Sequence, residues 1–314
     1  MQYAISEEYV NSDSIDEILK NYTKEISNRT INEGPSEQLY LKIDSALALG
    51  YKHEKYEEIA IITANYAVNL ERQGKLTQAK VILNRLLKYK DKIKAYYVGI
   101  LLSKRAPIFN QENKIDSALA DIEGALEGIG TGNNSILLGD TKYFYATALY
   151  AKGDVYNATI QYKEASDLFY SVDDIYSGNI CLEEMAGVLY KSDLAEEALG
   201  IYDLIFERSE GILELLSLAQ VLDIYDKTPY KEREKKALGK MIELYNIHYD
   251  SLNVFDKYTV DAKLLWYYLN QEDIKQAESY YTNVIESEFL KGGERDNCNI
   301  TSNQLYYHIL NKNK

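Results

Sequence analysis

The stretch of sequence that decides the fold is Tyr143–Ala165, YFYATALYAKGDVYNATIQYKEA. It reads as two helices joined at Gly153, because glycine accepts the backbone conformation in which helices commonly end. Ala146 and Ala158 are small residues at the positions where the two helices would approach each other closely. Tyr162 follows Ala158 by four residues, so both lie on one face of the second helix. The stretch therefore predicts a helical hairpin.

The alanine at position 158 recurs at a nearly constant step of 39, 40, 40, 39 and 40 residues. The alanines of this series are Ala79, Ala118, Ala158, Ala198, Ala237 and Ala277. Large or apolar side chains follow each of them four and seven residues later, and Leu39, Ile43 and Ala46 extend the same register toward the amino terminus. A period of this length is typical of stacked helical hairpins, in which each hairpin buries its faces against its neighbours.

The small residue, the turn residue, the alanine and the aromatic residue of this hairpin match the positions of the tetratricopeptide repeat, and the chain resembles that family over nearly its whole length. The turn positions are Gly34, Gly74, Gly153, Asp193 and Glu272. The resemblance implies an all-α fold, a right-handed α-α superhelix of about seven helical hairpins plus a C-terminal helix, in a single domain over residues 1–314. The hairpins are expected near residues 14–53, 54–91, 92–132, 137–172, 176–210, 211–250 and 255–289, with the terminal helix at 300–312.

Two places depart from the regular spacing. About seven extra residues stand between Gly99 and Ala118, around Pro107, and about six stand between Ala219 and Ala237. Both are expected to form longer loops inside a hairpin, as tolerated insertions or as contact loops.

Composition excludes several classes of partner. The formal net charge of −14 disfavours direct nucleic-acid binding, which needs clustered cations. No apolar run suits membrane insertion, and the first 30 residues lack the pattern of a signal peptide. We expect a cytoplasmic protein, or a periplasmic one if the sequence is a fragment of a membrane-anchored sensor.

Signatures of catalysis are weak. His53, His248 and His308 are far apart and match no metal-ligand spacing. The glycines at 128, 130 and 132 resemble a phosphate-binding loop, but they follow a helical pattern rather than a strand, so helix termination and a flexible link explain them better. We therefore expect no enzyme activity, no cofactor and no metal.

A ligand is expected on the inner wall of the superhelix, which in this family is formed by the first helix of each hairpin. The resemblance places these residues on that wall: Lys24, Asn28, Asn65, Tyr96, Lys104, Tyr143, Thr147, Tyr150, Glu183, Tyr190, Lys191, Gln220 and Trp266. Tyrosine is abundant, with 30 residues against 6 phenylalanines, and can offer both apolar area and a hydroxyl to a ligand. The alternative is that these tyrosines reflect composition alone, as Tyr162, Tyr202 and Tyr281 are expected in the core.

Lys24, Asn28 and Asn65 also coincide with three positions that hold a peptide carboxylate in some tetratricopeptide modules. The two cationic positions of the third hairpin are replaced by Ile93 and Tyr97, which argues against a complete clamp.

These observations favour a non-enzymatic interaction or sensor module that binds a peptide, protein segment or small ligand in its groove. Period and length are similar to the sensor segments of bacterial signalling and transcriptional regulators, including peptide-pheromone receptors. The alternative is an assembly scaffold or homodimerisation module that leaves the groove empty.

Overall fold

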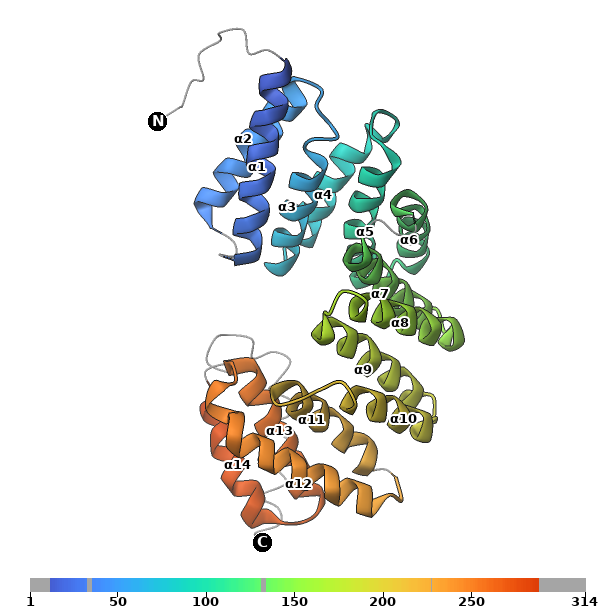
Figure 1. Cartoon of the computed structure of the whole chain (residues 1–314), viewed down its shortest axis with the longest axis vertical. Coiled ribbons are helices and arrows are strands. Elements are labelled where there is room, and N and C mark those ends of the chain that lie inside the picture. Colours follow the sequence, from blue (N-terminus) through green and yellow to red (C-terminus); the bar gives the residue numbers. More distant parts are fainter. Residues whose placement is uncertain (1–11, 33–35, 131–133, 227, 288–314) are drawn as a thin grey trace. The chain divides into compact units, whose positions relative to one another are not determined.

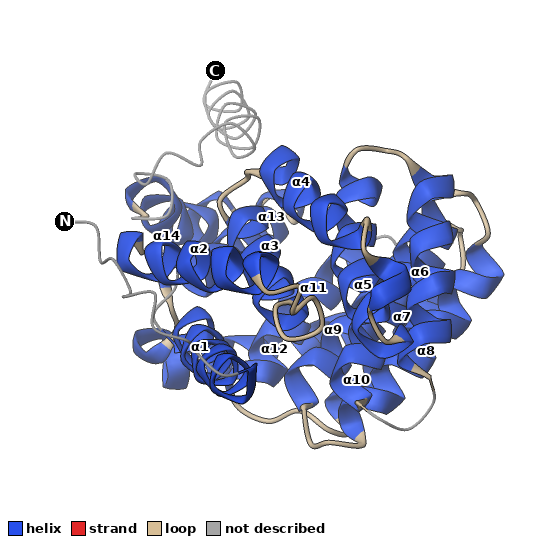
Figure 2. Ribbon diagram, turned by 90° about the horizontal axis from the view of Figure 1, so that it is seen from above, coloured by secondary structure: helices blue, strands red, loops and turns tan. Residues whose placement is uncertain are grey.

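In the computed structural model, the described residues are 12–32, 36–130, 134–226 and 228–287. They form fourteen α-helices and two short 3-10 helices, and none of these four ranges contains a strand (Figures 1 and 2). The chain divides into two compact units, residues 1–173 and residues 174–314, called here the first and the second unit.

The first unit consists of four consecutive helix pairs. Its helices are α1 (Ser12–Asn32), α2 (Glu37–Lys52), α3 (Ala60–Arg72), α4 (Leu76–Leu87), α5 (Ala95–Gln111), α6 (Ile115–Ile129), α7 (Ser135–Ala151) and α8 (Val155–Tyr170), with a 3-10 helix at Lys90–Lys92. The two helices of each pair pack against each other, and the first helices α1, α3, α5 and α7 also contact one another in succession.

The second unit continues the pattern with three pairs. Its helices are α9 (Ile175–Lys191), α10 (Ala195–Phe206), α11 (Ile212–Asp226), α12 (Lys231–His248), α13 (Val254–Asn270) and α14 (Ile274–Glu286), with a 3-10 helix at Tyr249–Ser251. Here α9, α11 and α13 are the first helices, and α11 contacts both of the others.

The alanines that recur in the sequence form a buried row along the second helices of the hairpins, called here the seam. The alanines of the series are all buried: Ala79, Ala118, Ala158, Ala198, Ala237 and Ala277. The residue seven positions later is buried in each of these helices, and the residue four positions later is buried in all of them except α14, where Tyr281 is half-buried. The prediction of one repeated helical face is confirmed.

The predicted turn positions adopt the left-handed conformation that ends a helix. The φ angles are +70° at Gly74, +88° at Gly153, +62° at Asp193 and +60° at Glu272. After Gly153, the amide of Asp154 donates to the carbonyl of Leu149 at 2.9 Å, and the other three turns form the equivalent bond. This bond satisfies a carbonyl that the helix end would otherwise leave unpaired.

The insertion predicted around Pro107 is wrong. Helix α5 runs without interruption to Gln111 with Pro107 inside it, and the turn falls at Asn113, whose φ is +57°. Ala106 precedes Asn113 by seven residues, as Ala146 precedes Gly153, so this hairpin has the regular length. The spacing is irregular only when it is counted from Gly99 instead of Ala106, and a proline inside a helix is unusual because it removes a backbone hydrogen bond.

The extra residues predicted between Ala219 and Ala237 are present, but they lengthen helix α12 instead of forming a long loop. Ala237 is the seventh residue of α12, whereas the corresponding alanine is the fourth residue of α4, α6, α8, α10 and α14. Helix α11 ends at Asp226 and α12 begins at Lys231, with Pro229 between them in the sequence.

The glycine cluster has two different roles. Gly130 has a φ of +68° and ends α6, as predicted. Gly128 lies inside α6, where a Cβ atom would come within 2.4 Å of the Ala95 carbonyl oxygen. It therefore permits the close approach of α5 and α6, which the prediction of a flexible link missed.

Some predictions fall outside the described residues, namely the turn at Gly34, Gly132, His308 and the terminal helix at 300–312. Of the helices between Ser12 and Glu286, none has the length and apolarity needed to cross a bilayer.

We expect Ala158→Leu to lower the free energy of unfolding by about 1–3 kcal/mol, because a larger side chain at this buried helix contact overpacks it. Urea denaturation followed by circular dichroism measures the change. Ala120→Leu, at an exposed position of α6, is the control and should have little effect. If the two variants had the same free energy of unfolding, the placement of Ala158 at a close helix contact would be wrong.

Gly128→Ala is expected to destabilise by about 1–3 kcal/mol, since its methyl group would collide with a backbone carbonyl. Gly200→Ala in α10 should instead stabilise by roughly 0.5–1 kcal/mol, because an added Cβ atom would meet nothing within 4 Å beyond its own stretch of helix and alanine favours the helix. The same denaturation experiment tests both, and changes of the same sign would refute the close contact between α5 and α6.

Candidate functional site

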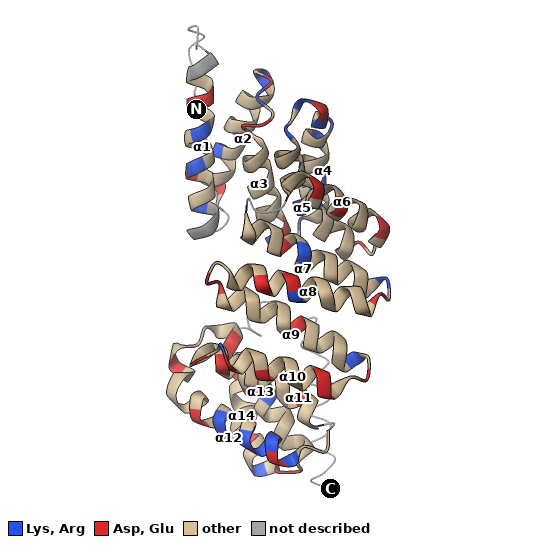
Figure 3. Cartoon of the chain, turned by 45° about the vertical axis from the view of Figure 1, so that its right-hand side comes forward, with Lys and Arg blue, Asp and Glu red and all other residues tan. Residues whose placement is uncertain are grey.

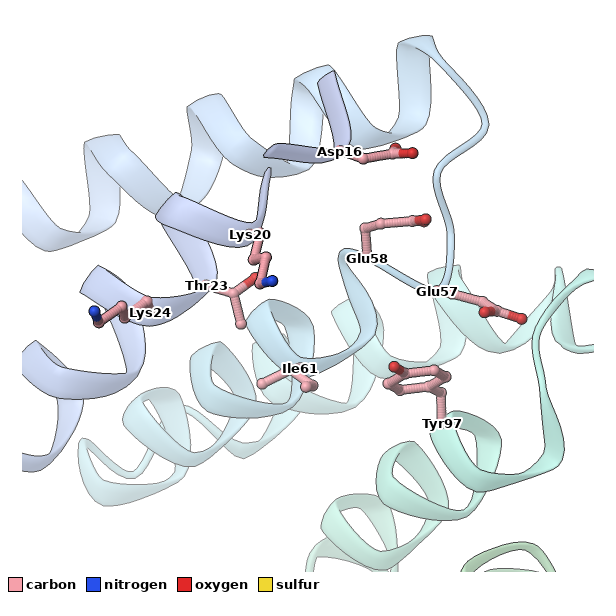
Figure 4. Close-up of a pocket in the computed structure, with 8 residues that line it drawn as sticks. All are labelled: Asp16, Lys20, Thr23, Lys24, Glu57, Glu58, Ile61 and Tyr97. Atoms are coloured by element: carbon pink, nitrogen blue, oxygen red, sulfur yellow. The ribbon is translucent and has the colours of Figure 1, made fainter. Parts of the chain in front are cut away.

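The candidate site is an open pocket of about 470 Å³ on the first-helix face of the first unit (Figure 4). Its walls come from α1, from the segment just before α3, and from α3 and α5. The lining residues are Asp16, Lys20, Thr23, Lys24, Glu57, Glu58, Ile61 and Tyr97.

The apolar part of the pocket is supplied by Ile61 of α3 and Tyr97 of α5. Both side chains are half-buried and pack against the core cluster that contains Ala64 and Ile100. Because α3 and α5 are neighbouring first helices, their contact fixes these two side chains next to each other. Ile61 and Tyr97 form the floor of the pocket. Because the core cluster holds both side chains in place, this floor forms without a ligand.

Two of the carboxylates at the pocket are already paired. The Asp16 carboxylate lies 2.7 Å from the Lys55 ammonium. Glu57 accepts hydrogen bonds from the Lys94 ammonium at 2.8 Å and from the Lys94 amide at 2.9 Å. The hydrogen bond from the Lys94 side chain holds the pKa of Glu57 below its ordinary value.

The remaining charges of the lining form no ion pair, although Glu58 lies close enough to the Lys94 ammonium for their opposite charges to attract each other. Lys20 and Lys24, both exposed on α1, form no ion pair with any described residue, and neither does Glu58. Figure 4 shows the two lysines on α1 and Glu58 on the segment before α3. The pocket therefore offers unpaired cations on one side, an unpaired carboxylate on another and an apolar floor between them.

The other inner-wall residues predicted in the first three hairpins lie on the same helices but have partners of their own. The Asn65 amide donates to the Ser27 hydroxyl at 2.8 Å, which links α3 to α1. Lys104 pairs with Asp140 at 3.3 Å, which links α5 to α7. Tyr96 makes an edge contact with Tyr97, with ring centroids 5.5 Å apart. The last predicted residue of this group, Asn28, is exposed on α1.

In the fourth hairpin, two predicted wall residues contact the core. The Thr147 hydroxyl lies 3.2 Å from the hydroxyl of Tyr162, and the Tyr143 ring contacts the Tyr162 ring at a centroid distance of 5.6 Å. Tyr162 is buried, as predicted, so these side chains help to hold α7 on α8. Tyr150, one turn later on α7, is half-buried.

Hydrogen bonds also connect the first helices of the second unit. The Ser217 hydroxyl donates to the Glu183 carboxylate at 2.7 Å, and the Tyr190 hydroxyl donates to the Asp223 carbonyl at 3.3 Å. Both bonds join α9 to α11. The other predicted residues here are exposed Lys191, half-buried Gln220 and half-buried Trp266, which packs on the α13–α14 cluster.

By sequence, no protein-family model and no curated protein matches the chain. Solved structures do match. The apo form of the quorum sensor NprR from B. thuringiensis has a TM-score of 0.58 at 15% identity, over 94% of this chain and 81% of that one. BtubC from P. vanneervenii has a TM-score of 0.43 at 12% identity, over 90% and 94% of the two chains, and the TPR domain of P58(IPK) has 0.31 at 15%, over 96% and 79%. The chain has a tetratricopeptide-like fold.

Within this tetratricopeptide-like fold, the carboxylate-clamp positions do not assemble around the pocket. Lys24 lines it, but Asn65 is bonded to Ser27 and Ile93 is buried. Tyr97, at the other replaced position, contributes a ring to the floor instead of a cation.

Sequence reasoning missed Lys20, Glu58 and Ile61. A signal for Lys20 was present, because it precedes Lys24 by four residues and so shares its helical face. Glu58 carried no such signal, since it belongs to the connection before α3, whose path depends on packing. In the described part of the chain, no three His, Cys, Asp or Glu side chains are grouped to hold a metal ion.

We expect Glu183→Gln to stabilise the protein at neutral pH. Burial raises the pKa of Glu183 above its ordinary 4.5, opposed by the Ser217 hydrogen bond. The folded protein therefore binds this proton more tightly than the unfolded chain, and stability from this group is present below pH 4.5 and lost as the pH rises through the folded-state pKa.

Denaturation of the wild type and of Glu183→Gln at pH 4, 5.5 and 7 measures the effect, with exposed Glu197→Gln as the control. The stability advantage of the Glu183→Gln variant over the wild type should grow with pH. An advantage that is constant or shrinks with pH would show that the carboxylate is not penalised by burial.

Proposed function

We propose that this chain is a non-enzymatic interaction module that binds an extended peptide or protein segment across the first-helix face of its first unit. The observation that supports it best is the pocket between α1, α3 and α5, where free cations, a free carboxylate and an apolar floor meet. These groups are left unused by the fold, whereas most polar groups around them are paired.

The dimensions suit a short segment. Neighbouring packed helices are separated by roughly 8–10 Å, so a chain crossing from α1 over α3 to α5 travels on the order of 18 Å. An extended peptide advances about 3.3 Å per residue, and the crossing therefore takes about six residues. The pocket of about 470 Å³ within this path lies in the range of about 300–1,000 Å³ typical of ligand pockets, so it has room for a side chain of the segment.

The charges indicate the chemistry of that segment. An acidic side chain or a terminal carboxylate would pair with Lys20 and Lys24, which lie one turn apart on α1. An apolar side chain would cover Ile61 and Tyr97, and a basic group would face Glu58. A segment with this order of groups satisfies every unpaired charge in the pocket.

The wider role that we propose is sensing within a bacterial signalling or transcriptional regulator. The likeness in fold to a quorum sensor over nearly the whole chain supports this context. A role in assembly or homodimerisation is the competing proposal.

The test is selection of phage-displayed heptapeptides on the full chain, followed by calorimetric titration of the enriched peptides. Enriched sequences should combine an acidic and an apolar residue. Lys24→Glu should weaken binding by about tenfold or more, because it replaces an attraction with a repulsion. Lys88→Glu, at an exposed lysine after α4, is the matched control and should bind as the wild type does.

Two further variants extend the test along the first helices. Tyr150→Ala reports on α7, and Trp266→Ala reports on α13 of the second unit. Unchanged affinity in both variants and in Lys24→Glu would rule out the first-helix face as the binding surface. A stable dimer in light scattering without any enriched peptide would favour the assembly role.

A further inference from the structure

A second pocket, of about 290 Å³, lies in the second unit between α10, α11 and α12. Its apolar lining consists of Phe206 from α10 with Leu218 and Tyr225 from α11, and Leu218 and Tyr225 are buried. Helix α12 contributes Arg233, Lys236 and Lys240 to the rim. This pocket shares no residue with the peptide site proposed above.

The three cations differ in how they are held. Arg233 pairs with Asp203 at 2.6 Å and lies over the Tyr225 ring, with its guanidinium carbon 5.8 Å from the ring centroid. Lys236 forms no ion pair with any described residue. Lys240 has a single contact with Glu243, at 3.6 Å and between two exposed side chains. Such a contact contributes little, so the two ammonium groups are available to another partner.

Lys236 and Lys240 are four residues apart on α12 and both line the pocket. Like charges at this spacing repel each other on a helix. A bound anion between them would remove that repulsion. The carboxylate of Glu214, which also lines the pocket, acts in the opposite direction and would weaken binding of an anion.

The repeat register shows that this arrangement is specific to α12. Arg233 precedes the seam alanine Ala237 by four residues, and in α4, α6, α8, α10 and α14 the same position lies just before the helix begins. The extra turn of α12 therefore brings Arg233 into the helix. The position of Lys236, directly before the seam alanine, is held elsewhere only by uncharged or acidic residues: Gln78, Ser117, Asn157, Glu197 and Gln276.

We propose that this pocket binds a small amphipathic anion, with its carboxylate or phosphate head between Lys236 and Lys240 and its apolar body against Phe206, Leu218 and Tyr225. The volume lies near the lower limit of about 300 Å³ for small-molecule sites, which favours a compact ligand over a peptide. Figure 3 shows several basic residues on α12, in a chain whose net charge is −14.

Calorimetric titration of the full chain with octanoate, octyl phosphate and octylammonium, all below their micellar concentrations, tests this proposal. One or both anions should bind with one-to-one stoichiometry, and the tighter of the two identifies the head group. Octylammonium should not bind, because the head-group position is cationic.

Variants then locate the site. Lys236→Gln and Lys240→Gln should each weaken anion binding about fivefold, and Glu214→Gln should strengthen it. Lys235→Gln is the matched control, since Lys235 is exposed on the same helix but does not line the pocket. Circular dichroism melting of each variant checks that the fold is retained.

Three results would overturn the proposal. They are the absence of saturable binding by either anion, equal binding of octylammonium, and a loss of affinity in Lys235→Gln as large as in Lys236→Gln. If the anion experiment fails, the peptide proposal still stands, and if the peptide experiment fails, the anion proposal still stands, because the two experiments test different residues.

Discussion

The interaction on which the structure depends is the close contact that a small side chain permits between the two helices of a hairpin. Ala158, completely buried in α8, has counterparts in each second helix from α4 to α14. The left-handed turn, as at Gly153, then returns the chain so that this contact can form. The contact and the left-handed turn occur together in five hairpins, those that turn at Gly74, Asn113, Gly153, Asp193 and Glu272. The departures from the repeat lie in helices, because α12 gains a turn and α6 accepts Gly128 next to α5.

Hydrogen bonds and an ion pair between successive first helices also hold neighbouring hairpins together. Asn65 to Ser27, Lys104 to Asp140 and Ser217 to Glu183 each connect one hairpin with the next inside its own unit. Side chains that could face a ligand are thereby used to fix the positions of neighbouring helices. The groups that remain free, among them Lys20 and Lys24, are held on a surface that the bonded groups have already positioned. Stability and the proposed binding surface therefore share the same helices but use different side chains.

At both proposed sites the local charge differs from the net charge of the chain. The chain as a whole is acidic, and this disfavours long polyanions. The pocket of the first unit nevertheless combines two free lysines with a free glutamate, and the pocket of the second unit is rimmed by three cations above an apolar floor. Arg233 is already paired with Asp203, whereas the unpaired cations of the two proposed sites would attract an acidic group.

The sequence by itself determined the repeat, the buried register and the left-handed turns, because spacing along a helix fixes which residues share a face and few residues tolerate a positive φ. It misjudged Pro107, since whether a helix continues through a proline depends on what packs around it. It placed Lys24 on the wall where the candidate pocket lies but gave no sign that Glu58 and Ile61 would line that pocket, and it could not tell that Asn65 and Thr147 would have partners within the fold. Only the tertiary structure decided these points, because whether a polar side chain is free depends on neighbours on other helices, which lie 38 residues away in the sequence for Asn65 and 15 for Thr147.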